Sequence, residues 1–277
     1  MNAIYNILET ILPFSFMQYD FMKNAFLAIL VIGPLFGIIG TMIVENKMSF
    51  FSDALGHSAL AGIAIGTLIG ISNYSISMII FGIVFAILLN YIKNKKTAST
   101  DTIISVFSSF AVAIGLIILS KIGGISKYTE YLVGDILSVT LQEVGMLCII
   151  LILTFVIWIK LCNMLVLTST NAVLAKSRGI KVKVVENIFG ILIAVIVMLT
   201  VKWVGILLIN ALLILPAAAA RNIASNIREY TLYSVLISLV SGLLGLILSY
   251  MFSFATGPMI VAISAIIYFI TFMFRRK

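Results

Sequence analysis

Charged residues are scarce in this sequence, and their scarcity decides the solvent in which the chain folds. Only 10% of the 277 residues are charged, whereas 62% are hydrophobic. Soluble globular chains carry about 25% charged residues. A lipid bilayer accommodates so much apolar surface in helices of about 20 residues, which leaves little of the chain for soluble domains. We therefore expect an all-α polytopic membrane protein.

Catalytic and disulfide motifs are also missing. The sequence contains no GxxxxGK(S/T) phosphate-binding loop, no HExxH zinc-protease motif and no GxSxG nucleophile motif. We therefore expect that the chain is not an enzyme, and that any pumping uses ATP hydrolysed by another subunit or an ion gradient. The two cysteines, Cys148 and Cys162, lie in one apolar stretch without a CxxC pair and are predicted to be packing residues. The N-terminus lacks the basic region of a cleavable signal peptide.

The apolar runs predict nine transmembrane helices in a single domain that covers residues 1–277. The runs are continuous rather than alternating, which favours helices over a β-barrel. Residues 1–19 mix aromatic side chains with Glu9 and Pro13, as a segment lying at the membrane interface does. The predicted spans are 21–44, 49–71, 74–92, 102–121, 140–162, 184–203, 205–224, 230–252 and 257–274.

The basic residues predict the orientation of these spans. The net charge of +8 comes from residues in short gaps between apolar runs, a pattern of membrane proteins rather than of nucleic-acid binding. If the N-terminus lies outside, 14 of the 18 basic residues fall on the cytoplasmic side. The four outside are Lys23, Lys121, Lys127 and Lys202. Cytoplasmic loops carry an excess of Lys and Arg, so we expect an outside N-terminus and a cytoplasmic C-terminus.

The predicted cytoplasmic loop 163–183 is longer than the others. Its segment 171–179, NAVLAKSRG, contains helix-favouring Ala and Leu, and Gly179 is well placed to end a helix after Lys176 and Arg178. We expect a short helix lying across the inner surface. It either docks on a partner protein or rests on anionic lipid.

Asp53 and His57 depart from the apolar character of the second span. His57 is the only histidine in the chain. Residues four apart share one helix face, with about 5–6 Å between their Cβ atoms, so this carboxylate and imidazole can bind one divalent cation. Ionisable groups inside a membrane usually face a cavity or a partner. Two alternatives remain: Asp53 stabilises the helix N-terminus, or the two residues form an ion pair or proton relay.

Five further residues stand out in two spans. Gly62, Gly66 and Gly70 form a small-residue stripe roughly opposite Asp53 and His57, which predicts close packing of a neighbouring helix. Asn210 lies in the middle of a span, six residues before Pro216. A proline frees a backbone carbonyl and can bend or break the helix, so these two residues either border a substrate path or serve packing and a simple kink.

The chain resembles the permease subunits of zinc, manganese and iron ABC importers, nearly from end to end. The most specific stretch is 48–66, MSFFSDALGHSALAGIAIG, which contains Asp53 and His57. The second is 171–182, NAVLAKSRGIKV, similar to the cytoplasmic stretch of the family. The third is 204–224, VGILLINALLILPAAAARNIA, which contains Asn210 and Pro216.

The resemblance implies a function and a set of partners. Two copies of the chain would form a path through the cytoplasmic membrane of a prokaryote, with two cytoplasmic ATPase subunits and an external metal-binding protein. Asp53 and His57 match the metal-contact pair of the family. Ala175 and Gly179 match the stretch of the family that couples to the ATPase, and Asn171 and Lys176 lie in the same stretch. Asn171 stands where the family usually has an acidic residue.

The cargo expected from these residues is Zn²⁺ or Mn²⁺, since carboxylate and imidazole without thiolate argue against Cu(I). The sequence of stretch 48–66 resembles zinc-type members of the family more than manganese-type members, which favours zinc. No permanently bound cofactor is expected. The alternatives are a gradient-driven transporter that uses Asp53 and His57 as a proton relay, and a membrane scaffold without a transport path.

Overall fold

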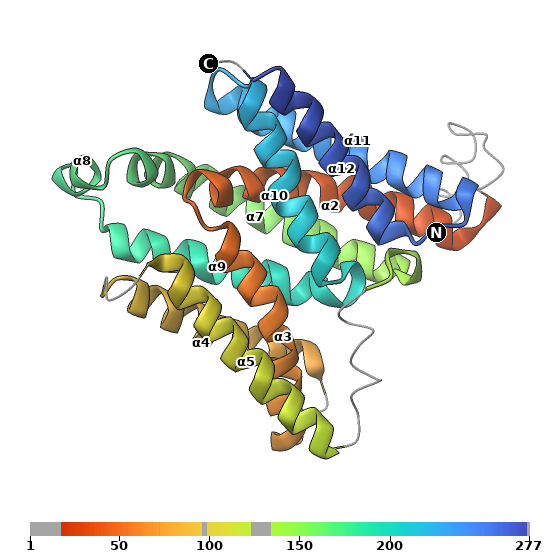
Figure 1. The fold of residues 1–277 in the computed structure, drawn as a ribbon, viewed down its shortest axis with the longest axis horizontal. Coiled ribbons are helices and arrows are strands. Elements are labelled where there is room, and N and C mark those ends of the chain that lie inside the picture. The colour runs from red at the N-terminus through yellow and green to blue at the C-terminus, as the bar shows by residue number, and fades with distance from the viewer. Residues whose placement is uncertain (1–17, 72, 96–98, 123–133, 276–277) are drawn as a thin grey trace. The chain divides into compact units, whose positions relative to one another are not determined.

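The computed structural model describes residues 18–71, 73–95, 99–122 and 134–275, and these residues form helices without any β-strand (Figure 1). Nine helices in the described ranges are long and apolar enough to cross a membrane, as the sequence predicts. They are α2 (Asp20–Glu45), α3 (Ser49–Ile69), α4 (Tyr74–Lys93), α5 (Thr100–Ile122), α7 (Leu141–Thr170), α9 (Val182–Val204), α10 (Ile206–Ile223), α11 (Ile227–Phe252) and α12 (Thr256–Met273).

Two short helices complete the described structure, the 3-10 helix η2 (Ile136–Ser138) and α8 (Ala172–Ser177). α8 is the short helix expected within loop 163–183. Most of the predicted interfacial segment 1–19 lies outside the described residues.

The predicted ends of the spans hold within a few residues, except at α7. This helix runs to Thr170, whereas the predicted span ends at 162. Residues 163–170 contain neither glycine nor proline, and the Ser169 hydroxyl donates to the Val166 carbonyl at 2.9 Å, within the helix. The helix therefore continues through the first part of the predicted loop. Only residues 171–181, which include α8, separate α7 from α9.

The described chain divides into two compact units. Unit 1 comprises Met1–Gly40, Asp135–Phe155 and Ala211–Lys277, and unit 2 comprises Thr41–Gly134 and Val156–Asn210. In unit 1, α11 packs closely on α2, because Gly37 leaves room for Val235 and accepts a 2.8 Å hydrogen bond from the Ser234 hydroxyl. The prediction of a single transmembrane domain is not tested by this division.

Unit 2 is built around α3, which packs against α4, α5 and α9. Gly62 and Gly66 face α4: a Cβ at Gly62 would lie 3.0 Å from Met78 Cα, and the Ser77 hydroxyl donates to the Gly62 carbonyl at 2.5 Å. Gly70 does not share the expected packing role. It ends α3 with φ +80°, and no atom lies within 4 Å of a Cβ built there. A left-handed glycine is a common helix stop, so Gly70 serves termination rather than packing.

The junction between α9 and α10 depends on Gly205. This residue has φ 81° and ψ 154°, a conformation that essentially only glycine adopts without strain. Gly134 packs directly against the Gly205 backbone, which leaves no room for a side chain at Gly134. Gly205 therefore sets the direction in which α10 leaves α9.

Replacing Gly205 with alanine tests this requirement. Gly205→Ala is expected to lower the free energy of unfolding by about 1–3 kcal/mol, because a Cβ is strained at that φ and ψ. Thermal unfolding of the purified chain in detergent measures the change. The matched control is Gly145→Ala inside α7, where no atom lies within 4 Å of the new Cβ. Helical alanine is favoured over glycine by about 0.5–1 kcal/mol, so the control should not lose stability. Equal melting temperatures for the two variants would contradict the assignment.

Candidate metal-contact site

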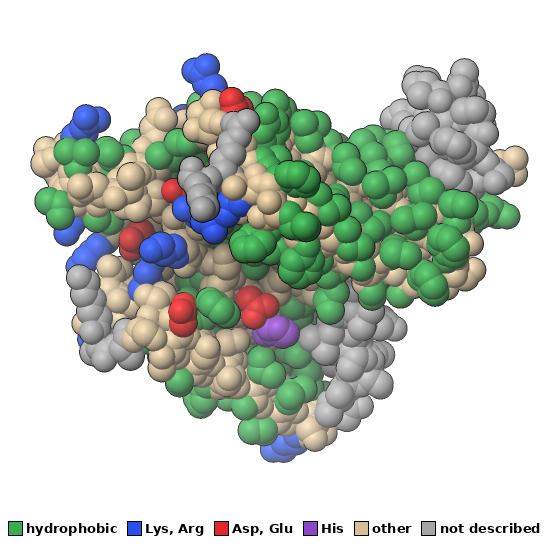
Figure 2. All heavy atoms as spheres, turned by 45° about the horizontal axis from the view of Figure 1, so that its top comes forward, with side chains coloured by type: hydrophobic (Ala, Val, Ile, Leu, Met, Phe, Trp, Pro, Cys, Tyr) green, Lys and Arg blue, Asp and Glu red, His purple; other side chains and the backbone are tan. Residues whose placement is uncertain are grey.

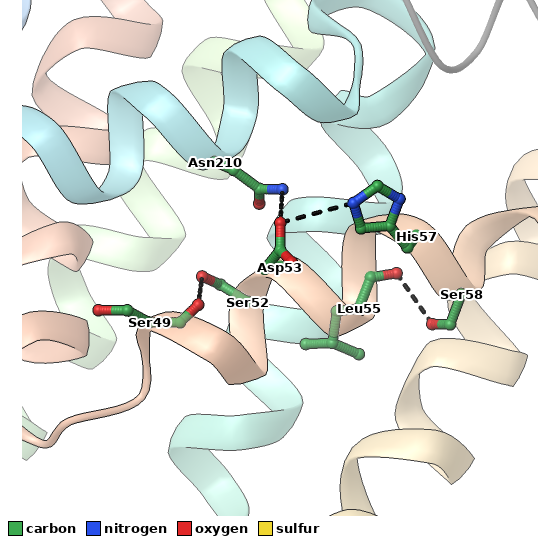
Figure 3. A network of polar contacts seen from close by, with 7 residues as sticks. All are labelled: Ser49, Ser52, Asp53, Leu55, His57, Ser58 and Asn210. Atoms are coloured by element: carbon green, nitrogen blue, oxygen red, sulfur yellow. Dashed lines mark hydrogen bonds and ion pairs between the residues drawn. The ribbon is translucent and has the colours of Figure 1, made fainter. Parts of the chain in front are cut away.

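Asp53 and His57 lie on one face of α3, as their spacing predicts. His57 Nε2 is 3.6 Å from Asp53 Oδ1 (Figure 3). This distance exceeds that of a hydrogen bond, so the two groups form an ion pair only when His57 is protonated. Their side chains are 46% and 48% exposed, and Figure 2 shows the single histidine at the surface beside an acidic side chain. The pair therefore lies on an exposed face of the chain.

The opposite face of α3 is packed. Phe51 and Leu55 are 2% and 0% exposed, so the helix has one buried face and one open face at the level of the pair. α3 begins at Ser49 and has no acidic residue in its first turn. The helix dipole acts mainly within that turn, so stabilisation of the N-terminus does not account for Asp53.

Asn210 joins this pair from α10. Its Nδ2 donates a hydrogen bond to Asp53 Oδ1 at 2.6 Å (Figure 3). Its Oδ1 is buried and has no hydrogen-bond partner among the described residues. The residue predicted to border a substrate path is thus in direct contact with one predicted metal ligand. All three residues belong to unit 2.

Gly56 permits this contact, and sequence reasoning did not single it out. A Cβ at Gly56 would lie 3.0 Å from Ile206 Cγ2 and 3.7 Å from the Asn210 amide atoms. The absence of a side chain at residue 56 therefore leaves room for the close approach of α10 to α3 at this point. The signal in the sequence is its position three residues after Asp53, on the same helix face.

The three side chains offer one carboxylate, one imidazole and one carboxamide at a single place. No group of three or more His, Cys, Asp or Glu residues that could hold a metal ion occurs in the described part of the chain. One chain therefore supplies two ionisable donors and an amide, which is too few for a closed structural metal site. An open set of this kind suits an ion that binds and leaves.

Pro216 lies inside α10, which continues without interruption from Ile206 to Ile223. The residue belongs to unit 1, whereas Asp53, His57 and Asn210 belong to unit 2. The place of Pro216 beside a substrate path therefore stays a prediction.

α8 is shaped by two of the residues predicted to couple to an ATPase. Asn171 caps it, since its side chain accepts hydrogen bonds from the backbone N–H groups of Val173 and Leu174, both at 3.0 Å. Gly179 ends it with φ +80°, as Gly179 N–H donates to the Lys176 carbonyl and Ile180 N–H to the Ala175 carbonyl. Asparagine is as good an N-cap as aspartate, so the replacement of an acid at 171 leaves the helix start intact.

The exposed side of α8 is formed by residues other than Ala175. Ala175, which belongs to the predicted ATPase-coupling stretch, is fully buried and faces the rest of unit 2. Val173 and Leu174, which the sequence analysis did not select, are 78% and 43% exposed, and Lys176 is exposed beside them. Their signal is two adjacent bulky apolar residues in a connection that also carries Lys176 and Arg178.

Comparison with known proteins identifies a family over most of the chain. A family model described as the ABC 3 transport family matches residues 18–275. The chain is 33% identical to the manganese import system permease protein ScaB of Streptococcus parasanguinis, over 94% of this chain and 92% of the relative. It is 29% identical to the high-affinity zinc uptake system membrane protein ZnuB of Haemophilus influenzae, over 94% of this chain and 99% of the relative.

A solved structure has the same fold. It is described as PsaBC from Streptococcus pneumoniae in complex with Fab, and the match has a TM-score of 0.81 at 28% identity, covering 98% of this chain and 95% of the other. The resemblance drawn from the three sequence stretches is thereby confirmed. The chain, which has nine candidate spans among its described residues and no ATPase motif in its sequence, belongs to the ABC 3 transport family.

Proposed function

We propose that the chain is the permease subunit of an ATP-driven importer that moves manganese or zinc ions across the cytoplasmic membrane of a bacterium. One observation carries the proposal: Asp53, His57 and Asn210 converge on an open point between otherwise apolar helices. The permeases named ScaB and ZnuB, which serve manganese and zinc systems, support the same class of cargo.

The energy source follows from the family. ATP hydrolysis belongs to a partner subunit in an ABC system, so this chain supplies the path and not the chemistry. This favours ATP-driven import over the alternative of a gradient-driven transporter that uses Asp53 and His57 as a proton relay. An external metal-binding protein would deliver the ion, with the N-terminus outside as the basic residues predict.

A second copy of the chain would complete the path. Each chain offers one carboxylate and one imidazole, and both are about half exposed in the isolated chain. Ionisable groups in a membrane are costly unless they face a partner or a water-filled cavity. A homodimer in which the two open α3 faces meet, or line one aqueous path, supplies that environment and doubles the number of donors.

The donor set is compatible with both candidate ions. Carboxylate and imidazole suit Zn²⁺, whereas carboxylate and amide oxygens suit Mn²⁺. The sequence of stretch 48–66 favours Zn²⁺. Rotation of the Asn210 amide would turn its Oδ1 towards Asp53 and add such an oxygen. Growth of a deletion strain under metal limitation, rescued with one metal at a time, identifies the cargo.

Removing either ionisable donor should stop transport. In the complete transporter reconstituted in vesicles, Asp53→Ala and His57→Ala are each expected to reduce ATP-driven Zn²⁺ and Mn²⁺ uptake to the level of vesicles without ATP. The physical reason is loss of one of two ionisable donors per chain. Co-purification with the ATPase should persist. The matched control is Asp101→Ala, an exposed acid in the first turn of α5. Undiminished uptake by both Asp53→Ala and His57→Ala would contradict the proposal.

The hydrogen bond between Asn210 and Asp53 should be measurable as an energetic coupling. A double-mutant cycle with Asp53→Ala and Asn210→Ala is expected to give about 0.5–1.5 kcal/mol of coupling, the range for polar contacts between membrane helices. Thermal unfolding of the four proteins in detergent provides the values. The pair Asp101→Ala and Asn210→Ala serves as the reference cycle and should be additive. Additivity of the first pair would show that the contact contributes nothing to stability.

The exposed apolar residues of α8 should carry ATPase docking. Val173→Asp is expected to weaken co-purification with the ATPase about tenfold, about 1.4 kcal/mol, because a charge replaces an apolar contact. Val173→Thr keeps the shape and serves as the control. Ala175→Arg should also weaken it, but by displacing α8 from unit 2, since Ala175 is buried. Full ATPase binding by the Val173→Asp variant would count against this docking surface.

A further inference from the structure

The contact between α9 and the start of α3 suggests how movement at α8 reaches the metal-contact site. Gly190 of α9 is buried against α3 and α4: a Cβ built there would lie 3.3 Å from Cζ of Phe51 and 2.7 Å from Nδ2 of Asn90. Phe51 is 2% exposed and precedes Asp53 by two residues. Its ring rests on α9 at the one place where a glycine leaves it room.

A second polar contact fixes α4 to α9 at the same level. Asn90 is 1% exposed, and its Nδ2 donates to the Glu186 backbone carbonyl at 3.2 Å. Farther along the same two helices, Gly82 of α4 accommodates the Met198 side chain of α9. α4 and α9 are therefore held together at two levels, and a displacement of α9 is shared with α4.

α3 is held at two places, with the metal contacts between them. At its start, Phe51 lies against Gly190 of α9. Beyond His57, Gly62 and Gly66 lie against α4, with the Ser77 hydroxyl bound to the Gly62 carbonyl. Asp53 and His57 occupy the stretch between these supports, on the open face of the helix.

α9 is also connected to α8. The two helices are in contact, and Ala175 of α8 is fully buried. The connection 178–181 is short and internally bonded, since Ile180 N–H donates to the Ala175 carbonyl and Val182 N–H to the Ile180 carbonyl, both at 3.0 Å. A displacement of α8 therefore moves the beginning of α9, on which Gly190 lies about two helical turns from the start.

We propose that the packing of Phe51 on Gly190 is a mechanical joint that transmits movement of α8 and α9 to Asp53, and so couples ATP hydrolysis to release of the ion. Phe51 and Gly190 are positioning residues, because neither touches the ion-binding groups. All the contacts used lie within unit 2. The inference rests on the proposed import function, and it adds the residues through which that function is driven.

The test uses the complete transporter in vesicles and measures metal uptake and ATP hydrolysis together. Gly190→Val enlarges α9 against Phe51 and is expected to lower the metal carried per ATP about tenfold, within the usual range of coupling between sites, while ATP turnover stays within about twofold. Phe51→Leu, which removes ring volume, should also lower the ratio. The double variant Gly190→Val with Phe51→Leu relieves the contact with Phe51 but not the one with Asn90, so the ratio should recover in part. Gly145→Val, where no atom lies near the new Cβ, is the control.

Each outcome is decisive. Recovery of the ratio in the double variant, with ATP turnover unchanged, supports the joint, because a merely structural defect would lower uptake and ATP turnover together. An unchanged ratio in Gly190→Val, or an equal loss of uptake and ATP turnover, overturns it. If Gly190→Val does not reach the membrane, Phe51→Leu decides alone, and an unchanged ratio overturns the joint. A wild-type transporter that moves neither Zn²⁺ nor Mn²⁺ with ATP refutes the import function instead.

Discussion

The hydrogen bond from Asn210 to Asp53 is the interaction on which the rest of the candidate site depends. It joins α10 to α3 across 157 positions of sequence at a length of 2.6 Å. The donor is a neutral amide, so it orients the carboxylate without cancelling its charge. A lysine or arginine in the same place would form a salt bridge and compete with an incoming cation. The choice of asparagine therefore keeps Asp53 both fixed in position and available to a metal ion.

The bilayer makes the exposure of the pair informative. A charge near the centre of a membrane helix costs about 2.5–3.5 kcal/mol on insertion scales. Asp53 and His57 are about half exposed on a helix whose other face is packed, so in lipid their open side must meet water, an ion or another polypeptide. This is a physical argument for an aqueous path or a second subunit at that face, and it is independent of the resemblance to other permeases.

The sequence predicts those structural features that depend on residues close together in the chain. Helical spacing placed Asp53 and His57 on one face, and Gly179 ends the short helix as predicted, because a helix stop acts over a few residues. The bond between Asp53 and Asn210 could not be predicted, because nothing local relates residues so far apart. The inward direction of Ala175 was also hidden, since a six-residue helix is too short for a reliable apolar period.

Two further differences have the same origin. Gly70 continues a four-residue spacing of glycines, yet the spacing alone does not distinguish a packing contact from a helix stop. α7 extends beyond its predicted end because residues 163–170 contain neither glycine nor proline to stop the helix. In both cases the pattern of apolar residues alone did not locate the end of the helix.

α9 connects the two sides of the site, and this constrains how the site can change. Through Gly190 it supports Phe51 at the start of α3, and through Gly205 it continues into α10, which carries Asn210. If α9 and α10 were one rigid rod, a shift of α9 would carry both partners of the bond together. Gly205 separates the two helices with a backbone conformation that is not helical. α9 and α10 are therefore two helices and not one continuous rod, and the bond between Asp53 and Asn210 lies beyond the break at Gly205.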